Sequence, residues 1–277
     1  MVINRWFARP FGFSNAAPVM SAQQHQYILI DEAAQAPEPD TINLISQLQS
    51  SGDVAAQVTL IGDPCQSAAV CKTTADAEVW EISLLERFYQ VDGMDPVMLE
   101  IQYRMPEQIV AWSMGHLHHG KLRSASHLCR RQCTIGGSSW PNGWPLAFVD
   151  VCGTERMVGM SRVNPDEVAV IRKIVRSLVQ HGHMDAEDIA VLTPYDAQRL
   201  ALREALDYPK MFIDSIEKAQ GSERAVVLIS NARSNSYHGI GFVLSAKRLN
   251  VGITRAKRGL ILIGNAHTLY RGDQEGC

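Results

Sequence analysis

Apolar runs that stop at polar side chains recur along this chain. Residues 27–30 end at the adjacent carboxylates Asp31 and Glu32, and residues 58–62 run into an Asp-Pro pair with Gln66 close behind. An unbroken run of this length predicts a buried parallel strand, and ligands of open α/β sheets sit at the carboxyl ends of such strands. Two runs of this kind predict a polar site at one sheet edge, although each alone also fits a strand turning into solvent, the second through a Gly-Asp-Pro turn.

These polar groups suit phosphate chemistry. A carboxylate such as Asp31 can hold Mg²⁺ through its water shell, and a neighbouring one such as Glu32 can orient a water for attack on a phosphate. The amide of Gln66 can donate to a phosphate oxygen and accept from a water.

Helical periodicity predicts two helices between and after these strands. The first begins near Pro37 and Pro39, and the second covers residues 79–88. Their apolar faces carry, in turn, Ile42, Ile45 and Leu48, and then Ile82, Leu85 and Phe88. Residues 1–26 show neither period and contain two prolines and a glycine that predict loop, so we interpret them as an irregular leader.

The rest of the chain alternates strands and helices. Apolar runs predict strands over residues 146–151, 189–192, 212–216, 225–230 and 260–264, with an amphipathic helix over residues 107–114 before them. Asn164, Pro165 and Glu167 form the pattern of a capping box, and Asp196 is expected to cap the next helix. This alternation predicts a second parallel sheet with crossover connections, behind a boundary near residues 96–101.

Charged side chains gather near that boundary and near the last predicted strand. Arg104, at the junction, is suited to reach a phosphate, or else pairs with Glu100 as a surface arginine. Within residues 247–257, Arg248 and Arg255 are seven apart, so a helix would place both on one face, either for phosphate sensing or as an ordinary amphipathic surface.

A glycine and a glutamate complete the candidate ligand-binding residues. Gly221 allows the backbone to approach a ligand closely, and Glu223 can accept hydrogen bonds from a ribose.

Composition narrows the class of protein. Hydrophobic residues at 46%, charged residues at 20% and a net charge of −3 predict a globular protein without a global basic field, so nucleic acid would have to bind in a local groove. Six scattered cysteines predict reduced thiols and an intracellular protein, cytoplasmic or nuclear. No apolar run is long enough for a membrane span, so no membrane partner is expected.

A zinc site is the alternative for the histidine and cysteine residues of one region. They are His116, His118, His119, His127, Cys129 and Cys133. Their Cys-x₃-Cys spacing is not a common zinc-knuckle spacing and no second matched pair follows, which argues against that site.

Five segments occur in a fixed order along residues 27–266. They are Asp-Glu-Ala-Ala-Gln from Asp31, Gly-Asp-Pro-Cys-Gln from Gly62, Gln-Tyr-Arg-Met from Gln102, Gln-Gly-Ser-Glu from Gln220, and Arg-Leu-Asn-Val-Gly-Ile-Thr-Arg-Ala-Lys from Arg248. This series resembles superfamily 1 helicases of the up-frameshift type, which act in nonsense-mediated decay, and the related RNA-silencing helicases. The resemblance implies an α/β P-loop NTPase fold of two RecA-like domains, with ATP between them and single-stranded RNA or DNA bound across both. The first domain would be partial, at residues 27–98, and the second complete, at residues 99–277.

The resemblance also implies roles for individual residues. Asp31 would position Mg²⁺, Glu32 the attacking water, and Gln66 would sense the γ-phosphate of ATP. Tyr103 would stack on the adenine and Glu223 would meet the ribose, with Gly221 and Arg248 also in the nucleotide site. Arg104 and Arg255 would act as arginine fingers, and Thr193, Tyr195 and Ser215 would face the nucleic acid.

The chain departs from the family pattern in two places. It contains no Gly-x-x-x-x-Gly-Lys-Ser/Thr, the loop that holds the phosphates, so the amino-terminal half of the helicase core is expected upstream of residue 1 as a missing partner. Ser67 replaces the usual Leu, and Ala68-Ala69 the usual Gly-Pro. We therefore expect the carboxyl-terminal part of an ATP-dependent helicase, inactive alone, or alternatively a helicase-derived scaffold that binds nucleic acid or protein.

Overall fold

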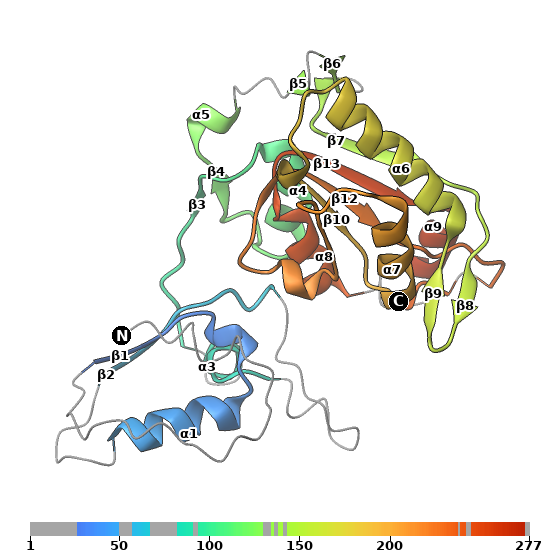
Figure 1. Cartoon of the computed structure of the whole chain (residues 1–277). Helices are drawn as coiled ribbons and strands as arrows, with labels where there is room; N and C mark the ends of the chain where they lie inside the picture. Colours follow the sequence, from blue (N-terminus) through green and yellow to red (C-terminus); the bar gives the residue numbers. More distant parts are fainter. Residues whose placement is uncertain are drawn as a thin grey trace. The chain divides into compact units, whose positions relative to one another are not determined.

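The chain divides into two compact units, Met1–Met98 and Leu99–Cys277. The computed structural model describes residues 27–49, 57–66, 82–90, 94–129, 134–135, 138–140, 143–237, 239–241 and 245–274 (Figure 1). The predicted loop over residues 1–26 lies outside these ranges, as does Ser67 with the two alanines that follow it.

The first unit contains a two-stranded parallel sheet. Strand β1 (Tyr27–Ile30) pairs with β2 (Gln57–Leu60), as the two apolar runs predict. The prediction that β1 is buried on both faces is wrong, because Tyr27 and Leu29 are 69% and 55% exposed while Ile28 and Ile30 are buried. One face of the described sheet is therefore covered.

Helix α1 (Glu38–Gln49) supplies that cover, and α3 (Leu84–Gln90) adds to it. Leu44, Ile45 and Leu48 of α1 pack on the buried strand residues, whereas Ile42 is exposed, so the predicted apolar face is shifted around the helix. The second helix begins at Leu84, after Ser83, whose Oγ accepts a hydrogen bond from the backbone N–H of Glu86 at 3.1 Å. Ile82 therefore precedes this helix, contrary to the prediction.

The second unit is built on a five-stranded parallel sheet, as predicted. Its strands are β7 (Leu146–Asp150), β10 (Ile189–Leu192), β11 (Phe212–Asp214), β12 (Arg224–Ser230) and β13 (Ala256–Gly264). They lie in the order β11-β10-β12-β13-β7, and every neighbouring pair is parallel.

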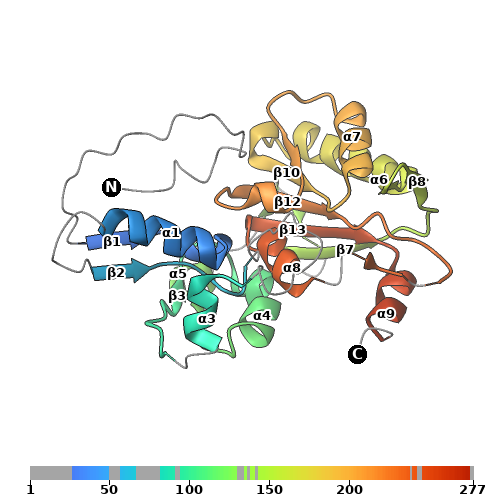
Figure 2. The ribbon, with the colours of Figure 1, turned by 90° about the horizontal axis from the view of Figure 1, so that it is seen from below.

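Helices cover both faces of this sheet (Figure 2). Ile189, Val191 and Val226 face α6 (Pro165–Gln180) and α7 (Asp196–Ala205), and the alternate strand residues Ala190 and Leu192 face α4 (Glu107–His116) and α8 (Ala246–Ile253). Because both strand faces are buried, the strands are continuous apolar runs rather than alternating ones. Helix α9 (Ala266–Gln274) follows β13.

Short elements fill the connections. The strand pairs are β3 (Ile101–Gln102) with β4 (Arg123–Ser124), β5 (Thr134–Ile135) with β6 (Ser138–Ser139), and the hairpin of β8 (Arg156–Val158) with β9 (Ser161–Val163). The short helices are η2 (Ala33–Gln35), α5 (Ser126–Cys129), η4 (Ala186–Asp188) and η5 (Glu217–Ala219). None of the helices in the described part of the chain is long and apolar enough to cross a membrane.

The start of α6 confirms half of the predicted capping box. Asn164 is the N-cap, and its Oδ1 accepts hydrogen bonds from the backbone N–H groups of Asp166 and Glu167 at 3.2 and 3.3 Å. The reciprocal half is wrong, because Glu167 Oε2 accepts from Ser230 Oγ at 2.6 Å and from the backbone N–H of Ala232 at 3.0 Å. This glutamate joins α6 to the end of β12 instead.

Two other predicted helix ends differ from the structure. Tyr195 occupies the N-cap position of α7, while Asp196 is its first residue and accepts from Arg199 at 3.0 Å. Helix α8 ends at Ile253, so Arg255 lies beyond it and does not share a helical face with Arg248. The Thr254 hydroxyl donates to the Asn250 carbonyl at 2.8 Å and closes the last turn.

Candidate functional site

In the first unit, the carboxyl ends of β1 and β2 are joined by backbone hydrogen bonds. The Ile61 N–H donates to the Ile30 carbonyl and the Ala33 N–H to the Ile61 carbonyl, both at 2.8 Å. Gly62 permits this approach, because a Cβ there would lie 3.1 Å from the backbone nitrogen of Ala33. The polar residues that follow the two strands therefore belong to one sheet edge, as the two apolar runs predict.

Asp31 and Glu32 leave β1 in a tight turn. The backbone of Glu32 is left-handed, with φ of 55°, and its N–H donates to Asp31 Oδ1 at 3.0 Å. The Asp31 side chain is exposed at this edge. A left-handed conformation is uncommon for a residue with a side chain and recurs at functional sites.

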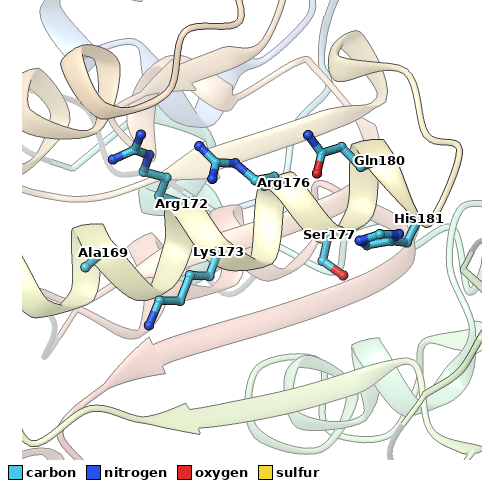
Figure 3. A pocket seen from close by; sticks show the side chains of 7 residues that line it. All are labelled: Ala169, Arg172, Lys173, Arg176, Ser177, Gln180 and His181. Atoms are coloured by element: carbon cyan, nitrogen blue, oxygen red, sulfur yellow. The ribbon is translucent and has the colours of Figure 1, made fainter.

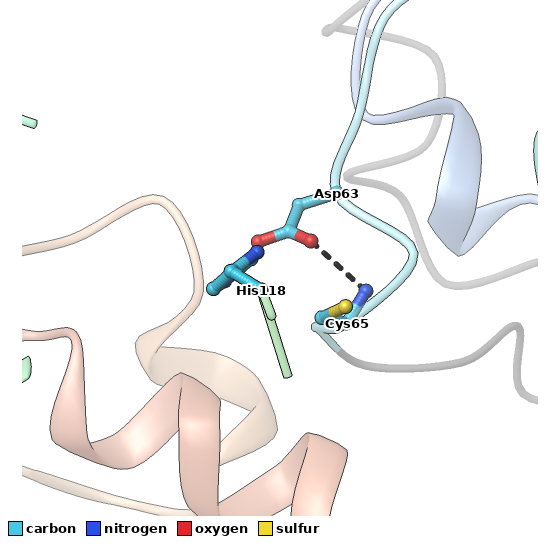
Figure 4. A group of neighbouring side chains, drawn as sticks. All are labelled: Asp63, Cys65 and His118. Carbon is cyan, nitrogen blue, oxygen red and sulfur yellow. Dashed lines mark hydrogen bonds between the residues drawn. The ribbon is translucent and has the colours of Figure 1, made fainter. Parts of the chain in front are cut away.

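Asp63 organises the turn after β2 (Figure 4). Its Oδ1 accepts from the Cys65 backbone N–H at 2.9 Å and its Oδ2 from Gln66 Nε2 at 3.0 Å. Asp63 therefore orients the Gln66 amide, a role that the sequence analysis does not predict for it. An aspartate side chain that accepts from the backbone N–H two residues later forms an Asx turn. Aspartate favours this turn, so the sequence does contain a signal for it.

In the second unit, the loop between β3 and α4 is held by Gln102. Its Oε1 accepts from the backbone N–H groups of Arg104 and Met105 at 2.8 and 3.0 Å, and its Nε2 donates to the Met105 carbonyl at 2.6 Å. This side chain fixes the backbone that carries Tyr103 and Arg104.

Arg104 and Glu223 form an ion pair across 119 residues of sequence. Arg104 Nε donates to Glu223 Oε2 at 2.8 Å, and Arg104 Nη1 donates to the Thr254 carbonyl at 3.0 Å. The alternative partner, Glu100, is therefore wrong. Lys257 pairs with the other oxygen of Glu223. The hydrogen bond from Lys257, reinforced by Arg104 and opposed by burial, holds the pKa of Glu223 below its ordinary value.

Arg255 is buried, with 3% of its surface exposed. Its Nε donates to the Val251 carbonyl at 3.0 Å, its Nη2 to Thr254 Oγ1 at 2.9 Å and its Nη1 to the Ser222 carbonyl at 3.4 Å. Thr254 therefore contacts both arginines, one through its carbonyl and one through its hydroxyl. We name Arg104, Glu223, Arg255 and Lys257 the arginine–glutamate cluster.

The other predicted nucleotide residues lie around this cluster or apart from it. Gly221 has φ of +75° in the turn between η5 and β12, a conformation that favours glycine. Arg248 pairs with Glu217 of η5. The prediction omitted Lys257, the second residue of β13, which follows Arg255 by two positions.

Tyr103 presents an open aromatic surface. Tyr103 as a whole residue is 69% exposed, and its ring stacks on His127 of α5 with centroids 6.3 Å apart and planes inclined by 25°. An exposed ring is what stacking on a base requires.

The three residues expected to face nucleic acid differ in exposure. Thr193 and Tyr195 are buried, and the Tyr195 hydroxyl accepts from Arg233 Nη1 at 3.2 Å. Ser215, at the carboxyl end of β11, is half-buried. Only Ser215 offers partial surface to a strand in this structure, and the contact of all three with nucleic acid stays a prediction.

Some histidines of the histidine-rich region make other contacts in the part of the chain that the structure describes. No three of its histidines and cysteines come within liganding distance of one another there. His116 Nδ1 instead lies 3.0 Å from the Trp112 carbonyl, and His127 stacks on Tyr103. Cys133 and the side chain of Cys129 lie outside the described residues.

One segment comes close to a phosphate loop in sequence. Residues 115–121 have the spacing Gly-x-x-x-x-Gly-Lys, but Leu122 stands where the motif requires Ser or Thr. A phosphate loop follows a strand and opens a helix, whereas Gly115 lies inside α4, near its end. These residues therefore do not supply the missing loop.

A parallel sheet covered by helices on both faces, with a cluster of cations and a carboxylate beyond α8, defines a P-loop NTPase of RecA-like fold. The family model described as an AAA domain, AAA_12, matches residues 80–267. The chain belongs to this family and, within it, to the up-frameshift-like helicases.

Two relatives illustrate the match. The regulator of nonsense transcripts 1 homolog of Arabidopsis thaliana is 33% identical over 268 residues, which is 91% of this chain and 20% of that protein. The ATP-dependent helicase NAM7 of Saccharomyces cerevisiae is 33% identical over 258 residues, 88% of this chain and 26% of that protein. The chain thus spans about a fifth to a quarter of these relatives.

Among solved structures, the PRRSV helicase is similar at 18% identity and a TM-score of 0.43, over 88% of this chain and 35% of that one.

Proposed function

We propose that this chain is the carboxyl-terminal part of the motor core of an ATP-dependent helicase that moves along single-stranded RNA or DNA inside the cell, in the cytoplasm or nucleus. Residues 27–98 and 99–277 are the parts it contributes to two RecA-like domains. The arginine–glutamate cluster carries this proposal.

The cluster suits phosphoryl transfer. Catalysis of this reaction consists mainly of positioning and of stabilising charge on the phosphoryl oxygens. Arg255 is held by three acceptors and Arg104 by two, so neither guanidinium has to be ordered when the nucleotide binds. The two act as the arginine fingers, with Glu223 and Lys257 in support of Arg104, Glu223 also as the ribose contact, and Tyr103 as the base contact.

The first unit supplies the hydrolytic groups. Asp31 exposes a carboxylate at the sheet edge, and Mg²⁺ prefers such oxygen ligands, so this residue fits the ion. When bound, Mg²⁺ neutralises charge on the phosphates. Glu32 orients the attacking water, and Gln66, fixed by Asp63, senses the γ-phosphate.

A second function is favoured by one observation. The chain has no Gly-x-x-x-x-Gly-Lys-Ser/Thr, which is the main source of nucleotide affinity in this class. A helicase-derived scaffold that binds nucleic acid or protein without hydrolysing ATP needs no such loop. The ordered cluster argues against it, because a scaffold has no use for two positioned guanidinium groups.

A chimera separates the two functions. The phosphate-loop segment of a related helicase is fused ahead of residue 27, and ATP hydrolysis is measured with and without single-stranded RNA. We expect RNA-stimulated turnover that falls about 10³-fold on Arg255→Ala and is also lost on Glu32→Gln. Arg258→Ala, an exposed arginine outside the cluster, is the matched control and keeps turnover.

A folded chimera that binds RNA but hydrolyses no ATP would favour the scaffold. The chain alone is expected to show no turnover. Robust hydrolysis by the chain alone, abolished by Glu32→Gln, would contradict the need for an added phosphate loop.

A further inference from the structure

The exposed face of α6 carries a row of cations with no known role in ATP hydrolysis. Arg172, Lys173 and Arg176 are all exposed, and they line a hollow of about 440 Å³ together with Ser177, Gln180 and His181. Arg172 and Arg176 project to the same side of the helix (Figure 3). We name these six residues the α6 basic face.

Among the described residues, no carboxylate forms an ion pair with this face. Within the described part of the chain, Arg172, Lys173 and Arg176 make no ion pair or hydrogen bond, whereas Arg104 and Arg233 are both paired. The sequence contains no acidic residue between Glu167 and Asp185. Like charges three and four residues apart on a helix repel each other, so this arrangement does not serve the stability of α6.

The chemistry of the face matches a phosphodiester backbone. Arg172 and Arg176 are one turn apart, about 6 Å along the helix axis, and guanidinium groups bind phosphates through paired donors. Ser177 and Gln180 add uncharged donors of the kind that contact phosphates in nucleic-acid complexes. The whole chain has a net charge of −3, so the positive potential here is local and favours a polyanion that lies along α6.

We propose that the α6 basic face binds the phosphate backbone of a single nucleic-acid strand. Helix α6 packs on the sheet face opposite α4 and α8, so this surface is separate from the arginine–glutamate cluster. Thr193, Tyr195 and Ser215, which follow strands β10 and β11, are not among its residues. The inference rests on the proposed function for its ligand. It adds a second surface that contacts nucleic acid, and this contact does not depend on the base sequence of the strand.

The test is a fluorescence anisotropy titration of the whole chain with a labelled oligo(U) strand at several salt concentrations. The variant replaces Arg172, Lys173 and Arg176 with glutamine. Each phosphate contact on a single strand contributes about 0.7 to the slope of log K against log salt, so three lost contacts make the slope shallower by about 2. We expect binding at 50 mM salt to weaken on the order of tenfold.

A matched control loses the same charge elsewhere. Arg156, Lys210 and Arg271 are exposed cations on three other parts of the second unit, and their glutamine variant should keep the slope. A second variant, Arg172→Lys with Arg176→Lys, retains the charge and should also keep it. Circular dichroism melts of all the variants verify that α6 stays folded.

Four results would overturn the proposal. Equal losses in the variant and the control would show an effect of net charge alone. A variant that loses affinity for poly-glutamate but not for oligo(U) would assign the face to an acidic protein. If the unaltered chain binds no strand at low salt, the nucleic-acid part of the proposed function fails as well. If the unaltered chain binds RNA and the variant binds it with the same affinity and salt slope, only the α6 contact is refuted.

Discussion

Glu167 should make the second unit less stable as pH rises from about 4.5 to 7. Its carboxyl is fully buried, with one oxygen bonded to Ser230 and Ala232 and the other, Oε1, without a partner in the described structure. Burial raises the pKa of Glu167 from 4.5 to about 7, against the hydrogen bonds, which lower it, and with a smaller contribution from the negative charge of Glu155.

The sign follows from proton binding. Between pH 4.5 and 7 the folded protein retains a proton on Glu167 that the unfolded chain has released, so the free energy of unfolding falls as pH rises through this window. Below the window the carboxyl is neutral in both states and costs nothing. Above this window, the displacement of the pKa from 4.5 to about 7 lowers the free energy of unfolding by about 3 kcal/mol.

Glu167→Gln isolates this effect, because the amide stays neutral at every pH and its oxygen can accept the same two hydrogen bonds. The measurement is urea unfolding followed by circular dichroism at pH 4.5, 6, 7 and 8. The free energy of unfolding of the variant, relative to that of the unaltered chain, should rise by about 3 kcal/mol from the lowest to the highest pH. Glu187→Gln, at an exposed site, is the control and should show no such gain. A difference between Glu167→Gln and the unaltered chain that is constant with pH would refute the argument from burial.

Three further predictions concern single contacts. Asn164→Ala removes the cap of α6 and should cost about 1 kcal/mol, read as a lower melting temperature; no change would mean that water replaces the cap. Gly259→Ala would place a methyl group 2.0 Å from an indole carbon and should cost about 1–3 kcal/mol in urea unfolding, while Gly115→Ala, with open space around it in α4, should not destabilise. Lys257→Met removes the largest cause of the lowered Glu223 pKa, so this carboxyl should titrate at higher pH by carbon-13 NMR, and an unchanged titration would contradict the ion pair.

Local patterns are enough to predict the position of each strand of the second unit and the start of α6, although β13 begins at Ala256, four residues before the predicted strand. Residues 189–192 are buried on both faces, so they form an apolar run that can be recognised without knowing the partners. Asn164 was found as a cap because its bonds are to residues two and three positions away. Such features depend on neighbours in the chain.

The features that sequence reasoning missed depend on distant residues. Glu167 bonds to Ser230, 63 residues away, rather than to its own cap, because a buried hydroxyl at the end of β12 competes with the local backbone. Arg255 lies beyond the end of α8, contrary to the predicted helix over residues 247–257, because Thr254 ends α8 and β13 begins at Ala256. The resemblance to helicases identifies Arg104 and Glu223 as site residues, but their ion pair could be recognised only from the fold, because they are 119 residues apart.

The order of strands has a consequence for how the second unit is made. Strand β13 lies between β12 and β7, and its ladder joins residues 260–264 to residues 146–150. During synthesis, β7 has no neighbour in this sheet until β13 emerges, so an apolar strand edge stays open while the intervening helices form. A nascent or truncated chain that stops before residue 256 should therefore be prone to aggregation, and expression of this unit depends on its last strand.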